Sequence, residues 1–141
     1  MHHSAKTEYA CLAVLELAIQ YDCGRPIRVS TIAQRQEIPA RFLVQILLQL
    51  KGAGLVTSTR GSAGGYRLAK PPQEITLWQV SSLFDVDTRS NSGITPTTSS
   101  AQALYTVWQE VAGAKRRVLD SITFADLVQR VTAKAENMYY I

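Results

Sequence analysis

Cysteine and histidine are scarce in this sequence of 141 residues. Only Cys11 and Cys23 are present, and the two histidines stand together at His2 and His3. Two cysteines are too few for a disulfide framework, so nothing indicates an oxidising compartment and we expect a cytoplasmic protein. Hydrolytic catalysis usually needs an internal histidine or a nucleophile paired with one, and the chain offers neither. The sequence therefore predicts a protein that is not an enzyme and has no metal centre.

Long hydrophobic runs are also missing. Glu16, Gln45 and Gln79 interrupt the apolar stretches before any of them reaches the roughly 18 residues that a membrane-spanning helix needs. The first residues have neither the basic nor the apolar region of an export signal. With 46% hydrophobic residues, the composition is that of one folded domain, or of one domain with an extension. We expect no association with a membrane.

Positive charge is unevenly distributed along the chain. Residues 1–70 contain nine Lys or Arg and four acidic residues, a net charge of +5, whereas residues 71–141 have a net charge of −1. A module that binds a polyanion needs such a local excess, although solubility would explain five extra charges equally well.

The first half of the chain predicts three helices. Apolar spacing indicates a helix over residues 5–21, which Gly24 and Pro26 end. Ser30 is a good N-cap for a brief second helix that ends at Gln36. A tight turn at Pro39 then leads into the third helix, over residues 40–52.

A predicted β-hairpin follows the third helix. Residues 55–59 and 66–69 favour strands, and a glycine-rich tip separates them. Thr76 then caps a short helix over residues 77–84. Helix, short helix, tight turn, helix and hairpin is the order of elements in a winged helix-turn-helix domain.

The second half predicts a linker and a long helix. Eight of the fourteen residues 87–100 are Ser or Thr, which indicates a flexible loop. The helix that follows, over about 100–121, has apolar residues at alternating spacings of three and four, which is typical of a seam that pairs with a second helix. Thr123 and Asp126 resemble a capping box for a last helix, to about Lys134. The seam consists of Leu104, Val107, Val111, Ala114 and Val118.

The predicted fold is therefore mainly α with a small β-hairpin. We expect a winged helix-turn-helix domain over residues 1–86 and a flexible Ser/Thr-rich loop over 87–100. A long dimerisation helix and a C-terminal helix make up residues 101–141.

The third predicted helix has a buried stripe and an outward face. Arg41 and Gln45 lie four residues apart, so both can face the major groove, where Arg reads guanine and Gln reads adenine. Arg60 on the glycine-rich tip can enter a narrow minor groove. Taken singly, each is as well explained as a solvent-facing residue, and only the surrounding pattern favours DNA contact. The stripe consists of Leu43, Ile46, Leu47 and Leu50.

One string in the hairpin is specific. Gly54-Leu55-Val56 followed by Arg60-Gly61-x-x-Gly64-Gly65-Tyr66 resembles the Rrf2 family of bacterial winged-helix regulators, and the likeness covers most of residues 5–86. The resemblance implies a homodimer that binds DNA as a repressor or an activator. We expect it to occupy a palindromic double-stranded DNA operator and so to compete with RNA polymerase or recruit it. Val44 stands where some relatives carry an acidic residue, which implies a different preferred operator. The expected DNA-binding residues are Ser30, Arg41, Gln45, Lys51, Arg60, Gly61, Gly64, Gly65, Tyr66 and Arg67, with phosphate contacts also from Arg28.

The chain departs from this family in the loop before the long helix. Cluster-binding members place three cysteines there, whereas residues 87–100 contain neither Cys nor His, the side chains that hold iron–sulfur clusters. We therefore expect no cofactor. Two alternatives stay open: a regulator that senses through Cys23 or an apolar pocket near Trp78, and a winged-helix module that binds protein. Cys11 is expected to be a buried small residue, and Trp78 and Trp108 to be packing anchors.

Overall fold

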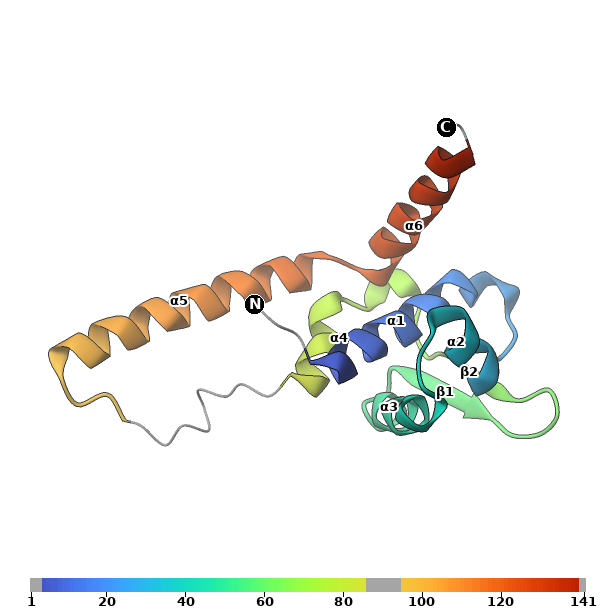
Figure 1. Cartoon of the computed structure of the whole chain (residues 1–141), viewed down its shortest axis with the longest axis horizontal. Helices are drawn as coiled ribbons and strands as arrows, with labels where there is room; N and C mark the ends of the chain where they lie inside the picture. Colours follow the sequence, from blue (N-terminus) through green and yellow to red (C-terminus); the bar gives the residue numbers. More distant parts are fainter. Residues whose placement is uncertain (1–3, 86–94, 140–141) are drawn as a thin grey trace.

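The chain folds into helices around one small hairpin, as a computed structural model that describes residues 4–85 and 95–139 shows (Figure 1). The mainly helical fold with a two-stranded antiparallel sheet confirms the predicted fold class. None of the described helices is long and apolar enough to span a membrane. The elements in order are α1 (Ala5–Ile19), η1 (Tyr21–Cys23), α2 (Val29–Gln36), α3 (Ala40–Gly52), β1 (Val56–Thr59), β2 (Gly65–Leu68), η2 (Pro72–Glu74), α4 (Leu77–Phe84), α5 (Ser99–Ser121) and α6 (Phe124–Tyr139).

The core surrounds α1. This helix packs against α2, α3, α4 and the start of α6, and its alanines Ala10 and Ala13 are fully buried. Their small side chains allow neighbouring helices to approach closely. The predicted stripe on α3 is confirmed, because all four of its residues are completely buried. This packing fixes α3 with its opposite face directed outwards.

The start of α2 differs from the prediction. The helix begins at Val29, its N-cap is Arg28, and no side chain caps it. Ser30 therefore lies inside the first turn, and the prediction that it caps the helix is wrong. Ile27 exchanges two backbone hydrogen bonds of 2.8 Å with Tyr66, and this bridge holds the chain extended up to Arg28, so the helix begins directly after it.

Two predicted caps are confirmed. Thr76 and Gln79 form a reciprocal capping box at the start of α4. At the start of α6, the Thr123 amide donates to Asp126 at 3.0 Å and the Asp126 amide donates to the Thr123 hydroxyl at 3.1 Å. The hydrogen bond from the Thr123 backbone is the main reason why the pKa of the Asp126 carboxyl is lowered. Helix α6 extends to Tyr139 rather than to Lys134, since no Gly or Pro interrupts it.

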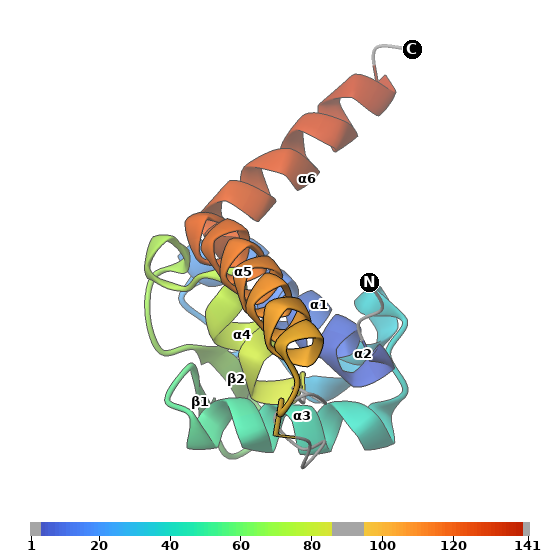
Figure 2. The same ribbon diagram turned by 90° about the vertical axis from the view of Figure 1, so that its left-hand side faces the viewer.

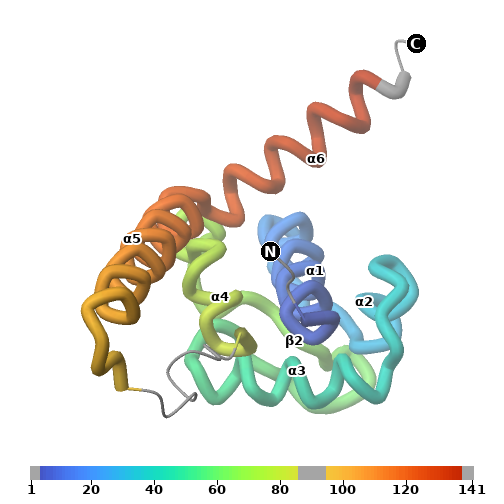
Figure 3. The backbone as a smooth tube through the Cα atoms, turned by 60° about the vertical axis from the view of Figure 1, so that its left-hand side comes forward, coloured from blue at the N-terminus to red at the C-terminus, as the bar shows by residue number. Residues whose placement is uncertain are grey.

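Helix α5 extends away from the rest of the molecule (Figure 1), and α6 projects from the domain in another direction (Figure 2). Viewed as a tube, α5 and α3 lie on opposite sides of α4 (Figure 3). No residue of α5 is buried. Trp108 is 46% exposed, so the prediction that it is a packing anchor is wrong within the single chain, because α5 stands away from the core. Trp78 is half-buried, and the guanidinium of Arg116 lies 4.9 Å from its ring centroid.

A short backbone bridge joins α4 to the junction between α5 and α6. The amide of Leu77 donates to the carbonyl of Ile122 at 2.8 Å, and the amide of Phe124 donates to the carbonyl of Ile75 at 2.9 Å. Phe124 is completely buried in the core. The base of the long helix is therefore fastened to the first domain, although the predicted boundary at residue 86 itself stays a prediction.

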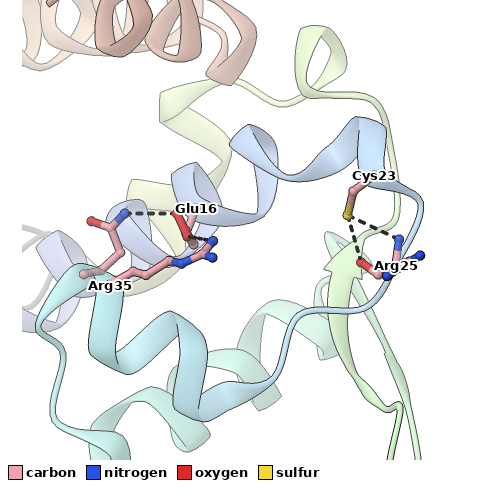
Figure 4. Close-up of polar contacts among 5 residues, drawn as sticks. Glu16, Cys23, Arg25 and Arg35 are labelled. Atoms are coloured by element: carbon pink, nitrogen blue, oxygen red, sulfur yellow. Dashed lines mark hydrogen bonds and ion pairs between the residues drawn. The ribbon is translucent and has the colours of Figure 1, made fainter. Parts of the chain in front are cut away.

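A buried carboxylate connects α1 with α2. Glu16 on α1 is only 3% exposed, and it accepts hydrogen bonds from Arg35 at 3.0 Å and Gln36 at 3.3 Å (Figure 4). A buried charge is tolerated when it is paired and hydrogen-bonded. This contact fixes the short helix of the helix-turn-helix against the central helix.

The turn between α2 and α3 contains a strained residue. Glu37 adopts a left-handed conformation, with φ 54° and ψ 44°, which costs roughly 1–2 kcal/mol in a residue that has a Cβ atom. Glycine avoids this cost but loses about 0.5–1 kcal/mol of chain entropy. We expect Glu37→Gly to raise the melting temperature by about 2–4 °C, measured by circular dichroism. Glu110→Gly, inside α5, is the control and should lower it; an unchanged melting temperature of Glu37→Gly would contradict the strain.

Candidate nucleic-acid interface

Helix α3 presents one exposed face to solvent. It spans Ala40–Gly52, as predicted, and Pro39 is its N-cap. Arg41 and Gln45 are exposed and lie opposite the buried stripe, because residues four apart share a helix face. In two views the helix lies at the edge of the domain (Figures 1 and 3). Its outward face is therefore accessible to a large ligand.

The side chain of Arg41 is positioned by an aromatic contact. Its guanidinium lies 4.9 Å from the ring centroid of Phe42, and that ring stacks on Tyr9 of α1 with centroids 6.4 Å apart. Stacking uses the flat face of a guanidinium and leaves its N–H groups at the edge. Arg41 therefore keeps the donors that a base edge or a phosphate would accept.

The hairpin forms the wing beside α3. Strands β1 and β2 pair antiparallel, from Val56 opposite Leu68 to Thr59 opposite Gly65. Arg60 and Gly61 lie at the exposed tip. The wing therefore presents one cation on a tip of small residues, as the sequence predicts.

A hollow of about 710 Å³ separates α3, the start of α2 and the wing. Three cations line it, and none of the described residues that line it is acidic. It brings together six of the predicted DNA-binding residues: Lys51, Arg60, Gly61, Gly64, Gly65 and Tyr66. The sequence did not predict the remaining lining residues as part of the interface, except for Arg28, because segments distant in the chain come together there only in the folded protein. The remaining lining residues are Arg28, Val29, Leu48, Ser58, Thr59 and Ser62.

Two arginines near the wing have structural partners. Arg28 donates to the carbonyl of Ser62 at the wing tip, and Arg67 donates to the carbonyl of Gly24 at 3.2 Å. Both hold the wing against the body of the domain, and their predicted DNA contacts stay predictions. Ser30 is exposed on α2 but does not line the hollow.

Gly64 and Gly65 are required by the fold itself. A Cβ atom at Gly64 would lie 2.1 Å from the carbonyl oxygen of Thr59, and one at Gly65 would lie 2.3 Å from that of Ile27. Gly65 also has a φ of 154°, which L side chains rarely adopt. Close backbone packing explains both glycines, whether or not DNA lies next to them.

The candidate sensing residues lie away from this hollow. Cys23 is exposed, and its sulfur contacts the backbone amide and carbonyl of Arg25 at 3.4 and 3.6 Å (Figure 4). Cys11 is half-buried, and burial, with smaller contributions from Glu8 and Asp85, raises the pKa of its thiol to about 12. At neutral pH this thiol is protonated, and a protonated thiol is a poor nucleophile.

A smaller hollow of about 240 Å³ lies between α1, α4, α5 and α6. Leu77 and Ser81 of α4 line it, and Trp78 does not. The pocket expected near Trp78 is thus lined by its neighbour Leu77 rather than by Trp78 itself. Its use as a sensing site stays a prediction.

The fold and the cationic hollow define a class, the winged helix-turn-helix proteins that bind DNA. A profile of the Rrf2 family, described as an iron-dependent transcriptional regulator, matches residues 3–130. The chain therefore belongs to the Rrf2 family, and the resemblance stated from its sequence is confirmed.

Individual relatives agree. The HTH-type transcriptional regulator IscR of Aliivibrio salmonicida is 34% identical over 131 residues, which cover 91% of this chain and 77% of that protein. The structure of T. potens IscR has a TM-score of 0.79 at 30% identity, covering 93% of this chain and 88% of that one. CymR of B. subtilis, the global cysteine regulator, has a TM-score of 0.77 at 29% identity, covering 92% and 98%. The prediction of a DNA-binding transcriptional regulator is confirmed.

The iron in the family's description does not fit the residues of this chain. Iron–sulfur clusters are held by several thiolates or imidazoles, and the whole sequence has two cysteines and the terminal histidines. Cys11 is protonated within a helix, as described above. No three His, Cys, Asp or Glu side chains among residues 4–85 and 95–139 are grouped to hold a metal ion. Residues 87–94 of the predicted loop lie outside the described residues.

Proposed function

We propose that the protein binds a palindromic operator as a homodimer and regulates transcription in the cytoplasm, without an iron–sulfur cluster or an enzymatic activity of its own. Residues 1–86 of each protomer would read DNA, and residues 101–141 would hold the dimer together. Occupancy of the operator would compete with RNA polymerase or recruit it. The regulatory role of the relatives supports a function in binding rather than in catalysis.

The observation that carries this proposal is the outward face of α3 beside the cationic hollow. Arg41 and Gln45 have the donors and acceptors that distinguish base pairs in the major groove. Lys51 on α3 and Arg60 on the wing both line the hollow. A phosphate backbone in the hollow would hold α3 in the groove, while Arg60 would reach the minor groove next to it.

The long helix α5 supports a homodimer. Leu104, Val107, Val111 and Val118 of the predicted seam are between 39% and 59% exposed, on a helix with no buried residue. A heptad seam of this kind is stabilised by a second helix of the same pattern. Two-fold pairing would present two copies of α3 to half-sites about 34–36 Å apart, or a multiple of that distance.

Selection of bound sequences from a random pool of DNA duplexes tests the proposal. We expect an enriched palindrome whose half-sites contain bases that Arg41 and Gln45 recognise. The absence of any enriched sequence would refute DNA reading by this chain.

Arg60→Ala should then weaken binding to the enriched operator at least about tenfold, because each half-site loses a minor-groove cation. Fluorescence anisotropy with a labelled duplex measures this affinity. Arg130→Ala, which removes the same charge from the exposed surface of α6, is the matched control and should bind as the wild type does. Equal affinities of both variants would favour the alternative in which the wing binds protein.

A further inference from the structure

The outward face of α3 also carries apolar side chains that the fold does not use. Val44 is 46% exposed and Leu48 is 55% exposed. Neither belongs to the core or to the partly buried residues packed against it. At 3.6 residues per turn, both lie in the same stripe as Arg41 and Gln45. This apolar pair therefore belongs to the surface that we propose to read bases.

The neighbouring Phe42 is also exposed, but unlike Val44 and Leu48 it has partners within the fold. Its side chain is 43% exposed, but its ring lies under the Arg41 guanidinium and against Tyr9. Phe42 thus lies at one flank of the outward face of α3 and supports the Arg41 guanidinium there. Its contacts do not account for Val44, which projects from the other side of the stripe.

The chemistry of the major groove restricts what Val44 can recognise. Base-pair edges there present donors and acceptors, and the only apolar group among them is the C5-methyl group of thymine. Along the helix, Val44 lies between Arg41 and Gln45, so it would meet the groove floor at neighbouring bases. Leu48 lies one turn further on and lines the hollow together with Lys51, where the sugar–phosphate backbone would run.

We propose that Val44 determines specificity by contact with the methyl group of one thymine in each half-site. This inference rests on the proposed binding of α3 in the major groove. It gives the operator a chemical requirement, a T·A pair next to the bases that Arg41 and Gln45 read.

The test uses the full-length protein and the operator obtained by selection. Each thymine of the half-site is replaced in turn by deoxyuridine, symmetrically in both halves, which removes the methyl group and keeps the hydrogen-bonding edge. Loss of one buried methyl group should weaken binding about fourfold per half-site, or roughly fifteenfold for the symmetric operator. We expect this loss at one thymine for the wild type, and a clearly smaller loss at that thymine for Val44→Ala, which keeps only the Cβ methyl group.

Leu48→Ala is the matched control, since it also truncates an exposed apolar side chain of α3. It should keep the full difference between thymine and deoxyuridine that Val44→Ala reduces. The inference is overturned if the selected half-site has no thymine, if no replacement weakens binding, or if Val44→Ala keeps the full difference. Each of these results leaves the proposed function standing, because an operator has been found. Failure to enrich any duplex would instead refute the proposed function and this inference together.

Discussion

Val111→Lys is expected to convert the protein from a dimer into a monomer and to weaken operator binding at least about a hundredfold. Val111 lies in the middle of the α5 seam and is 39% exposed in the single chain. In a paired seam the lysine would be buried without a partner, at a cost of about 3–5 kcal/mol. A monomer loses the simultaneous binding of two half-sites, which is worth about 10²–10⁴ in affinity. Light scattering coupled to size-exclusion chromatography measures the mass, and anisotropy measures the affinity.

Gln109→Lys is the matched control for this experiment. It adds the same charge to α5 on the face opposite the seam, where Gln109 is exposed. We expect this variant to remain dimeric and to bind the operator normally. A wild-type protein that is already monomeric, or a dimeric Val111→Lys variant, would contradict pairing through the seam.

Operator affinity should fall about a thousandfold or more between 50 and 200 mM salt. A dimer that contacts roughly six to ten phosphates releases that many counterions, and the logarithm of its affinity falls linearly with the logarithm of the salt concentration. The cationic hollow of each protomer provides these contacts in the proposed complex. Anisotropy titrations at four or five salt concentrations give the slope.

The slope also identifies the residues that bind phosphate. Lys51→Ala should reduce its magnitude by about two, one for each protomer. Lys134→Ala removes an equal charge from α6, where Lys134 is exposed, and should leave the slope unchanged. If both variants reduce the slope equally, net charge rather than the hollow controls the salt dependence.

Local signals in the sequence were sufficient to predict the helix that carries the candidate interface. Pro39 at one end and the glycines Gly52 and Gly54 at the other bracket α3, and its apolar spacing identifies the buried face. The remaining positions of α3, which are not in the buried stripe, then form its outward face. The capping boxes at Thr76 and Thr123 are equally local, since each involves residues three apart.

Contacts between distant segments could not be predicted in the same way. The bridge between Ile27 and Tyr66 determines where α2 begins, and it overrides the capping preference of Ser30. The hollow exists because the wing folds back towards Arg28, which contacts Ser62, a residue 34 positions further along the chain. For Trp108, helical spacing shows which residues share its face but not what covers that face.

The bridge that fastens α4 to the start of α6 has a consequence for allosteric control. Leu77 and Phe124 are each hydrogen-bonded across the junction, so the base of the long helix is held against the reading domain. In the proposed dimer, a change in the crossing angle of the two long helices would therefore rotate each reading domain together with its own long helix. Such a change in the crossing angle would alter the distance between the two recognition helices, and with it the fit to a fixed operator spacing.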